Sequence, residues 1–194
     1  MLNIASVRLC TQAEGPGKRM AIWLQGCLKR CFNCCNPHMQ PLIKRELHTE
    51  EALIAKIQEA HEKYGICGIT LLGGEPLLQA KGLLPVVRWC KQKNLSVLLF
   101  SGYTLAQIQK LPLEGAQELL DFVDVLVDGE YVDSLYDESR GIVGSSNQEI
   151  HFFTDTYSLK DFKSQVQVEV LVDGQGVKFN GWALIPKDLG AFKA

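Results

Sequence analysis

The sequence has 194 residues, a formal net charge of -2, 46% hydrophobic residues and 22% charged residues. This length supports one sizeable hydrophobic core and is marginal for two, and the composition is that of an ordinary globular protein. The near-neutral charge argues against nucleic-acid binding by bulk electrostatics, and no apolar run approaches the roughly 20 residues of a membrane span. We therefore expect one domain that binds neither nucleic acid nor membrane.

The first half of the chain shows two strand patterns and one helix pattern. Residues 2–9 and 19–25 are predicted strands, separated by a turn signal at residues 14–17. Thr49 is the expected N-cap of a helix with apolar residues at helical spacing, which Gly65 is placed to end.

The middle of the chain alternates strands and helices. Residues 67–72, 95–100 and 122–127 are predicted strands, with helical segments at about 79–93 and 115–121. The strands end about 27 residues apart, which is the size of a right-handed βαβ unit. We therefore predict an α/β fold with a parallel sheet, either open or curled into a partial barrel.

After about residue 132 this period is lost. Residues 141–148 read as a polar loop, 149–153 as a strand, and 166–172 with 177–179 as a hairpin around a turn at 173–176. We expect this tail to close an edge of the sheet.

Polar and glycine residues follow the predicted parallel strands, and a cysteine-rich loop follows the strand 19–25. In parallel α/β folds ligands bind at the carboxyl ends of the strands. We therefore expect these four loops to meet at one edge of the sheet.

Three cysteines form a C-x3-C-x2-C run at Cys27, Cys31 and Cys34. Thiolates are the ligands of iron–sulfur clusters, which normally have four, so three cysteines leave one iron open for a further ligand. The alternative is a zinc site, in which Cys31 and Cys34 would be joined by Cys35 or His38. Seven cysteines, an odd number, in a chain of this size and without a secretion signal favour metal or catalytic use in the cytoplasm.

The cysteine run is followed about forty residues later by a Gly-Gly-Glu-Pro segment. Together they resemble the radical S-adenosylmethionine (SAM) enzymes, and the chain is more narrowly similar to the activases of anaerobic ribonucleotide reductase. The similarity spans about residues 18–150 and includes further segments at 100–104 (FSGYT), 127–131 (VDGEY) and 140–148 (RGIVGSSNQ).

The resemblance implies a partial, open parallel (βα)6-type barrel with a β-rich extension at 151–194. It implies a [4Fe-4S] cluster on Cys27, Cys31 and Cys34, reductive cleavage of SAM to a 5′-deoxyadenosyl radical, and formation of a glycyl radical on an anaerobic ribonucleoside-triphosphate reductase. The electron would come from a donor such as flavodoxin or ferredoxin. The residues implied to bind the cofactor are Gly73, Gly74, Glu75, Pro76, Ser101, Gly102, Asp128 and Asn33.

Simpler interpretations remain open for the segments outside the cysteine run. Gly73 and Gly74 permit close backbone approach to a ligand, but could equally form a strand-to-helix turn with a solvated Glu75. The Ser101–Gly102 pair could be a turn and helix cap, and Asp128 a turn residue. Residues 140–148 could contact a partner or cap a loop.

Two positions depart from the family pattern. Asn33 stands where an aromatic residue commonly precedes the third cysteine, and Cys35 stands where the activases often have an aromatic residue. We expect Cys35 to be no ligand because adjacent side chains diverge. Cys10, Cys67 and Cys90 lie in apolar segments and are expected in the core.

Three rival functions share some of these motifs. A radical SAM enzyme acting on a peptide or small molecule would share all of them. A zinc-bound interaction module without catalysis would use the cysteines alone, and an electron-transfer ferredoxin would ordinarily add a fourth cysteine.

Overall fold

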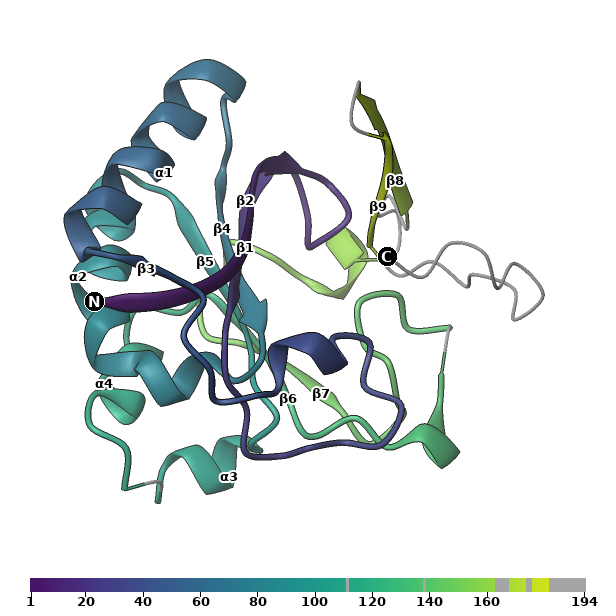
Figure 1. Cartoon of the computed structure of the whole chain (residues 1–194). Coiled ribbons are helices and arrows are strands. Elements are labelled where there is room, and N and C mark those ends of the chain that lie inside the picture. Colours follow the sequence, from purple (N-terminus) through teal and green to yellow (C-terminus); the bar gives the residue numbers. More distant parts are fainter. Residues whose placement is uncertain (111, 138, 163–167, 174–175, 182–194) are drawn as a thin grey trace.

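The computed structural model describes residues 1–110, 112–137, 139–162, 168–173 and 176–181. Seven strands form one open sheet in the order β3-β1-β2-β4-β5-β6-β7, and helices cover one of its faces (Figure 1). The strands are β1 (Leu2–Thr11), β2 (Arg19–Leu24), β3 (Glu46–His48), β4 (Gly68–Gly73), β5 (Ser96–Phe100), β6 (Val125–Asp128) and β7 (Glu149–Phe152).

Strands β2, β4, β5 and β6 are parallel neighbours, whereas β1, β3 and β7 pair antiparallel. The predicted parallel α/β sheet and its βα period are therefore confirmed. The six-unit barrel is not confirmed: antiparallel β1 and β7 flank the four parallel strands, and the sheet of the described residues stays open.

The helices are α1 (Glu50–Tyr64), α2 (Ala80–Gln92), α3 (Leu105–Ile108) and α4 (Ala116–Leu120). The predicted ends of α1 are confirmed: Thr49 Oγ1 accepts a hydrogen bond from Ala52 N, and Gly65 ends the helix with φ 64°. In the described parts of the chain, no helix is long and apolar enough to cross a bilayer.

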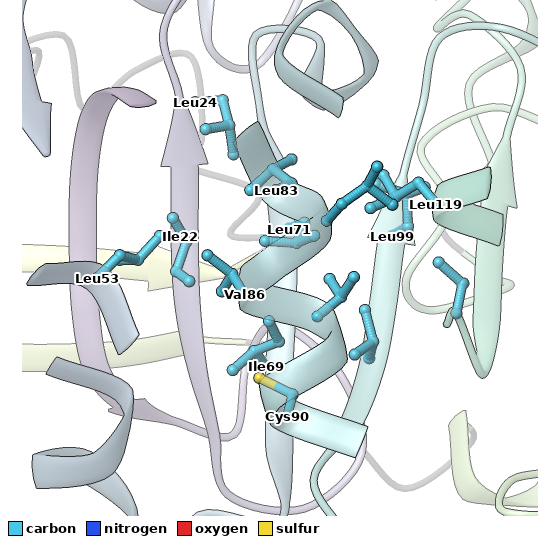
Figure 2. Packing of buried hydrophobic residues seen from close by; sticks show 14 of the residues in the cluster. Ile22, Leu24, Leu53, Ile69, Leu71, Leu83, Val86, Cys90, Leu99 and Leu119 are labelled. Atoms are coloured by element: carbon cyan, nitrogen blue, oxygen red, sulfur yellow. The ribbon is translucent and has the colours of Figure 1, made fainter. Parts of the chain in front are cut away.

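The main core lies between the sheet and α1, α2 and α4. Alternate residues of the parallel strands face these helices, and Figure 2 shows α2 packed across them. The opposite face is also buried, under the loop after β2 and the segments around residues 142 and 162. Burial on both faces accounts for the nearly continuous apolar runs of β4 and β5.

A fully buried arginine, Arg19, lies on this second face. Its guanidinium donates to Thr70 Oγ1 at 2.8 Å, Ser96 Oγ at 3.0 Å and Tyr157 Oη at 2.9 Å. It also donates to the Ile69 carbonyl at 2.6 Å. These bonds tie the segment after β7 to the start of the parallel strands.

The tail closes the sheet edge as expected, because β7 pairs with β6. The predicted hairpin forms a second sheet from β8 (Val168–Asp173) and β9 (Gly176–Gly181), whereas residues 166–167 and 174–175 lie outside the described residues. Glu169 of β8 accepts hydrogen bonds from Thr11 Oγ1 at 2.6 Å and Gln12 N at 2.7 Å, so this hairpin contacts the end of β1.

The cysteines outside the loop are only partly in the core. Cys90 is buried and confirmed as a core residue, and Cys10 is half-buried. The core assignment of Cys67 is wrong, because this residue is exposed. Cys67 directly precedes Gly68, the first residue of β4, and is therefore outside the buried strand.

Candidate functional site

The carboxyl ends of the four parallel strands lie at one edge of the sheet. The chain leaves β2 into the cysteine loop, β4 into the Gly-Gly-Glu-Pro segment, β5 into Ser101 and Gly102, and β6 at Asp128. The predicted meeting of these loops is therefore confirmed, and it follows from the parallel arrangement.

Backbone hydrogen bonds close the cysteine loop at its base. Gly26 N donates to Met39 O at 2.8 Å and Cys27 N donates to Gln40 O at 2.9 Å. Within the loop Asn33 has φ 52°, in the left-handed region that asparagine adopts more readily than an aromatic residue. The backbone therefore gives a physical reason for asparagine at this place; cofactor binding by Asn33 stays a prediction.

The three cysteine sulfurs sit in different environments. Burial raises the pKa of Cys27, whose sulfur accepts from Lys29 N at 3.4 Å. Burial also raises the pKa of Cys31, and a hydrogen bond from the backbone N–H of Tyr131 opposes that rise. Such N–H donors stabilise thiolate ligands.

Cys34 and Cys35 lie against each other. A hydrogen bond from the Cys35 thiol lowers the pKa of Cys34 to about 6, and the N–H of Asn36 contributes to this lowering. The expectation that Cys35 is no ligand stays a prediction.

The spacing of the cysteine sulfurs bears on the zinc alternative. Among the described residues, three ligand atoms within 4.8 Å of one another occur only at Asp128, Glu149 and His151. A single zinc ion would require its ligand atoms to be this close, whereas each thiolate of a cubane binds a different iron. Three thiols in one short loop, with backbone N–H donors at Cys27 and Cys34, are a donor set that suits an iron–sulfur cluster.

Gly73, the last residue of β4, and Gly74, which follows it, bring this segment against the cysteine loop. A Cβ at Gly73, where φ is 111°, would stand 2.6 Å from Leu24 N, and one at Gly74 would stand 2.3 Å from Gly26 O. Gly74 N donates to Leu24 O and Glu75 N to Gly26 O, both at 2.8 Å. The close approach is therefore to the chain's own backbone, and contact with a ligand stays a prediction.

Glu75 is fully buried, so the alternative of a solvated carboxylate is wrong. Its carboxyl group accepts from Leu77 N at 3.0 Å, from Gly102 N at 2.8 Å and from Ser101 Oγ at 3.1 and 3.2 Å. Burial raises its pKa to about 7. Pro76 follows as the first residue of the 3₁₀ helix Pro76–Gln79. Glu75 thus joins the β4 loop to the β5 loop.

Asp128 is buried where β6 ends and connects two further elements. It accepts from Leu105 N at the start of α3, and its Oδ2 lies 2.9 Å from His151 Nε2 of β7. These contacts show a structural role for Asp128; a role in cofactor binding stays a prediction.

The segment 140–148 caps the loop that follows β6. Gln148 Oε1 accepts from Gly144 N at 2.8 Å, while its Nε2 donates to Gly129 O at 2.9 Å. Arg140 Nη1 donates to Gln148 O at 2.9 Å. The loop held in this way carries the Tyr131 N–H that faces Cys31.

This support of Cys31 was not predicted from the sequence. The polar run 144–148 was a visible signal, and loop capping was one of its two interpretations. Its acceptor at Gly129 could not be identified, because 19 residues separate it from Gln148.

Comparison with known proteins supports the cluster interpretation. Residues 13–151 match a protein family described as "4Fe-4S single cluster domain". The chain is 33% identical over 148 residues to the anaerobic ribonucleoside-triphosphate reductase-activating protein of Vibrio cholerae, covering 73% of this chain and 92% of that protein. Proteins of the same name from Enterobacteria phage T4 and Escherichia coli K12 are each 29% identical, covering 79% and 71% of this chain and 96% and 90% of theirs.

One solved structure also aligns. QueE from Escherichia coli matches with a TM-score of 0.45 and 20% identity, covering 53% of each chain. This similarity is too low to bear on fold or function.

Proposed function

Because this chain belongs to the family of anaerobic ribonucleoside-triphosphate reductase-activating proteins and contains a 4Fe-4S single cluster domain, we propose that it is a radical SAM enzyme that generates a glycyl radical on such a reductase. The observation that carries the proposal is the three-cysteine loop at the edge where the parallel strands end. Three protein ligands on a [4Fe-4S] cluster leave one iron for SAM.

When bound and reduced, the cluster would supply one electron to the SAM sulfonium, whose cleavage would give methionine and a 5′-deoxyadenosyl radical. The chain contributes the ligands Cys27, Cys31 and Cys34. The N–H groups of Lys29 and Tyr131 and the hydrogen bond from Cys35 stabilise these thiolates.

SAM is proposed to lie between the cysteine loop and the loops after β4, β5 and β6. The Glu75 carboxyl group is already bonded to Leu77, Ser101 and Gly102, so its role there is to hold the β4 and β5 loops together. Contacts with SAM are assigned instead to the other residues of these loops. The residues proposed to form this site are Asn33, Gly73, Gly74, Glu75, Pro76, Ser101, Gly102 and Asp128.

The substrate is proposed to be a glycine of the reductase polypeptide, which loses a Cα hydrogen atom to the radical. The open sheet agrees with a macromolecular substrate, since a second protein can cover its edge. The electron is proposed to come from a donor such as flavodoxin or ferredoxin, in the cytoplasm.

Two measurements test the proposal. Anaerobically purified protein should contain about four irons and matching acid-labile sulfide per chain; one zinc without sulfide would contradict it. The reduced protein should then be incubated with SAM and an anaerobic ribonucleoside-triphosphate reductase. Electron paramagnetic resonance should show a carbon-centred doublet on the reductase. SAM cleavage without this doublet would favour a peptide or small-molecule substrate.

A further inference from the structure

A lysine of the cysteine loop reaches across to the loop after β5. Lys29 lies between Cys27 and Cys31, and its Cγ is 2.9 Å from where a Cβ at Gly102 would stand. Its ammonium lies 4.2 Å from the centroid of the Tyr103 ring, and its side chain is 16% exposed. A mostly buried cation is therefore held where the two loops meet.

The groups around this cation are mainly anionic. The Glu130 carboxylate lies 3.9 Å from the ammonium. The buried Glu75 carboxyl group is within its electrostatic reach, since Lys29 opposes the rise of the Glu75 pKa. Cys27 and Cys31, whose thiolates would carry negative charge as cluster ligands, stand two residues before and two residues after Lys29 in the chain. An anionic ligand group entering here therefore requires a cation.

Apart from the Tyr103 ring, the ammonium makes only long contacts with polar groups of the described residues. Gln107 Oε1 accepts from it at 3.4 Å and Glu130 lies at 3.9 Å, both beyond the usual 2.7–3.2 Å. By contrast, Lys91 donates to Asp124 at 2.7 Å. With three donors on the ammonium, Lys29 can exchange these weak contacts for a ligand carboxylate at little cost.

Resting on the proposed function, we propose that Lys29 is a positioning residue that binds the carboxylate of SAM. The carboxylate is the anionic group of this ligand, and Lys29 connects the loop of the cluster ligands to the loop of Ser101 and Gly102. The contact would orient the methionine end of SAM toward the cluster, and it would select against sulfonium nucleosides that lack a carboxylate.

The test compares two ligands on cluster-loaded protein by anaerobic equilibrium dialysis: SAM and decarboxylated SAM. Lys29→Met keeps the aliphatic stem against Gly102 and removes the charge. It should weaken SAM binding by about ten- to a hundredfold and decarboxylated SAM binding by less than about twofold. Lys29→Arg, which keeps the charge, should lose far less SAM affinity. Arg30→Met, an equal charge change at the exposed neighbour, should bind SAM like the wild type.

The other outcomes contradict the inference. Equal SAM affinity in Lys29→Met and wild type, or equal weakening for both ligands, would contradict the proposed contact between Lys29 and the SAM carboxylate. Either result would leave the proposed function intact. Wild-type protein with a full cluster that binds no SAM would overturn both. Iron and sulfide contents of all variants identify any change that arises from cluster loss.

Discussion

The buried Glu75 carboxyl group should make the stability of this protein depend on pH. Its pKa is raised from 4.5 to about 7 because burial disfavours the ionised form more than its hydrogen-bond donors favour it. Since the pKa is higher in the folded than in the unfolded chain, the stabilisation is fully present below about pH 4.5. It is then lost as the pH rises through about 7.

The size of the effect follows from the two pKa values. A change from 4.5 to about 7 corresponds to about 3 kcal/mol between the folded and unfolded states. Glu14 is also buried, and its pKa is raised to about 8 in the same direction. The contribution of Glu75 is therefore isolated by comparing the wild type with a variant that changes Glu75 and keeps Glu14.

Glu75→Gln provides that comparison, because the amide has nearly the same size and does not ionise. Urea unfolding of the reduced, cluster-free protein would be followed by circular dichroism between pH 5 and pH 8. The free energy of unfolding of the wild type minus that of the variant should fall by about 2.5 kcal/mol across this range, because part of the loss already occurs below pH 5. The Glu14 contribution cancels in this difference. A difference that stays constant with pH would refute the buried, raised-pKa carboxyl group.

Three further predictions concern the cluster, the β4 loop and the buried arginine. Cys31→Ala should abolish SAM cleavage under dithionite with little change in far-ultraviolet circular dichroism; retained cleavage would contradict its assignment as a ligand. Gly74→Val should lower the iron content as well as SAM binding, since its Cβ would meet the Gly26 carbonyl at 2.3 Å, and normal iron content would show that the two loops separate freely. Tyr157→Phe removes an acceptor of Arg19 and should lower the free energy of unfolding by about 1–3 kcal/mol in urea titration. An unchanged urea midpoint would mean that the Tyr157 hydroxyl does not hold the segment after β7 in place.

Much of the fold could be predicted because it depends on local patterns. The ends of α1 follow from the Thr49 cap and Gly65, and the strand ends follow from apolar runs that stop at glycine or polar residues. The barrel was not predictable in this way. Whether a sheet closes depends on whether its two outermost strands pair with each other, and in the described part of the chain β3 pairs only with β1 and β7 only with β6.

The cysteine run, its spacing and the loops after the parallel strands were determined by the sequence alone, because neighbouring residues and a regular βα period carry them. The tertiary structure decided how these loops support one another. It buried Glu75 under donors 26 and 27 residues further along the chain and brought Gln148 to Gly129 across 19 residues. It also placed Lys29 against Gly102 and Tyr103. Such contacts exist only once the parallel crossovers have brought distant strand ends to one edge, so no local pattern encodes them.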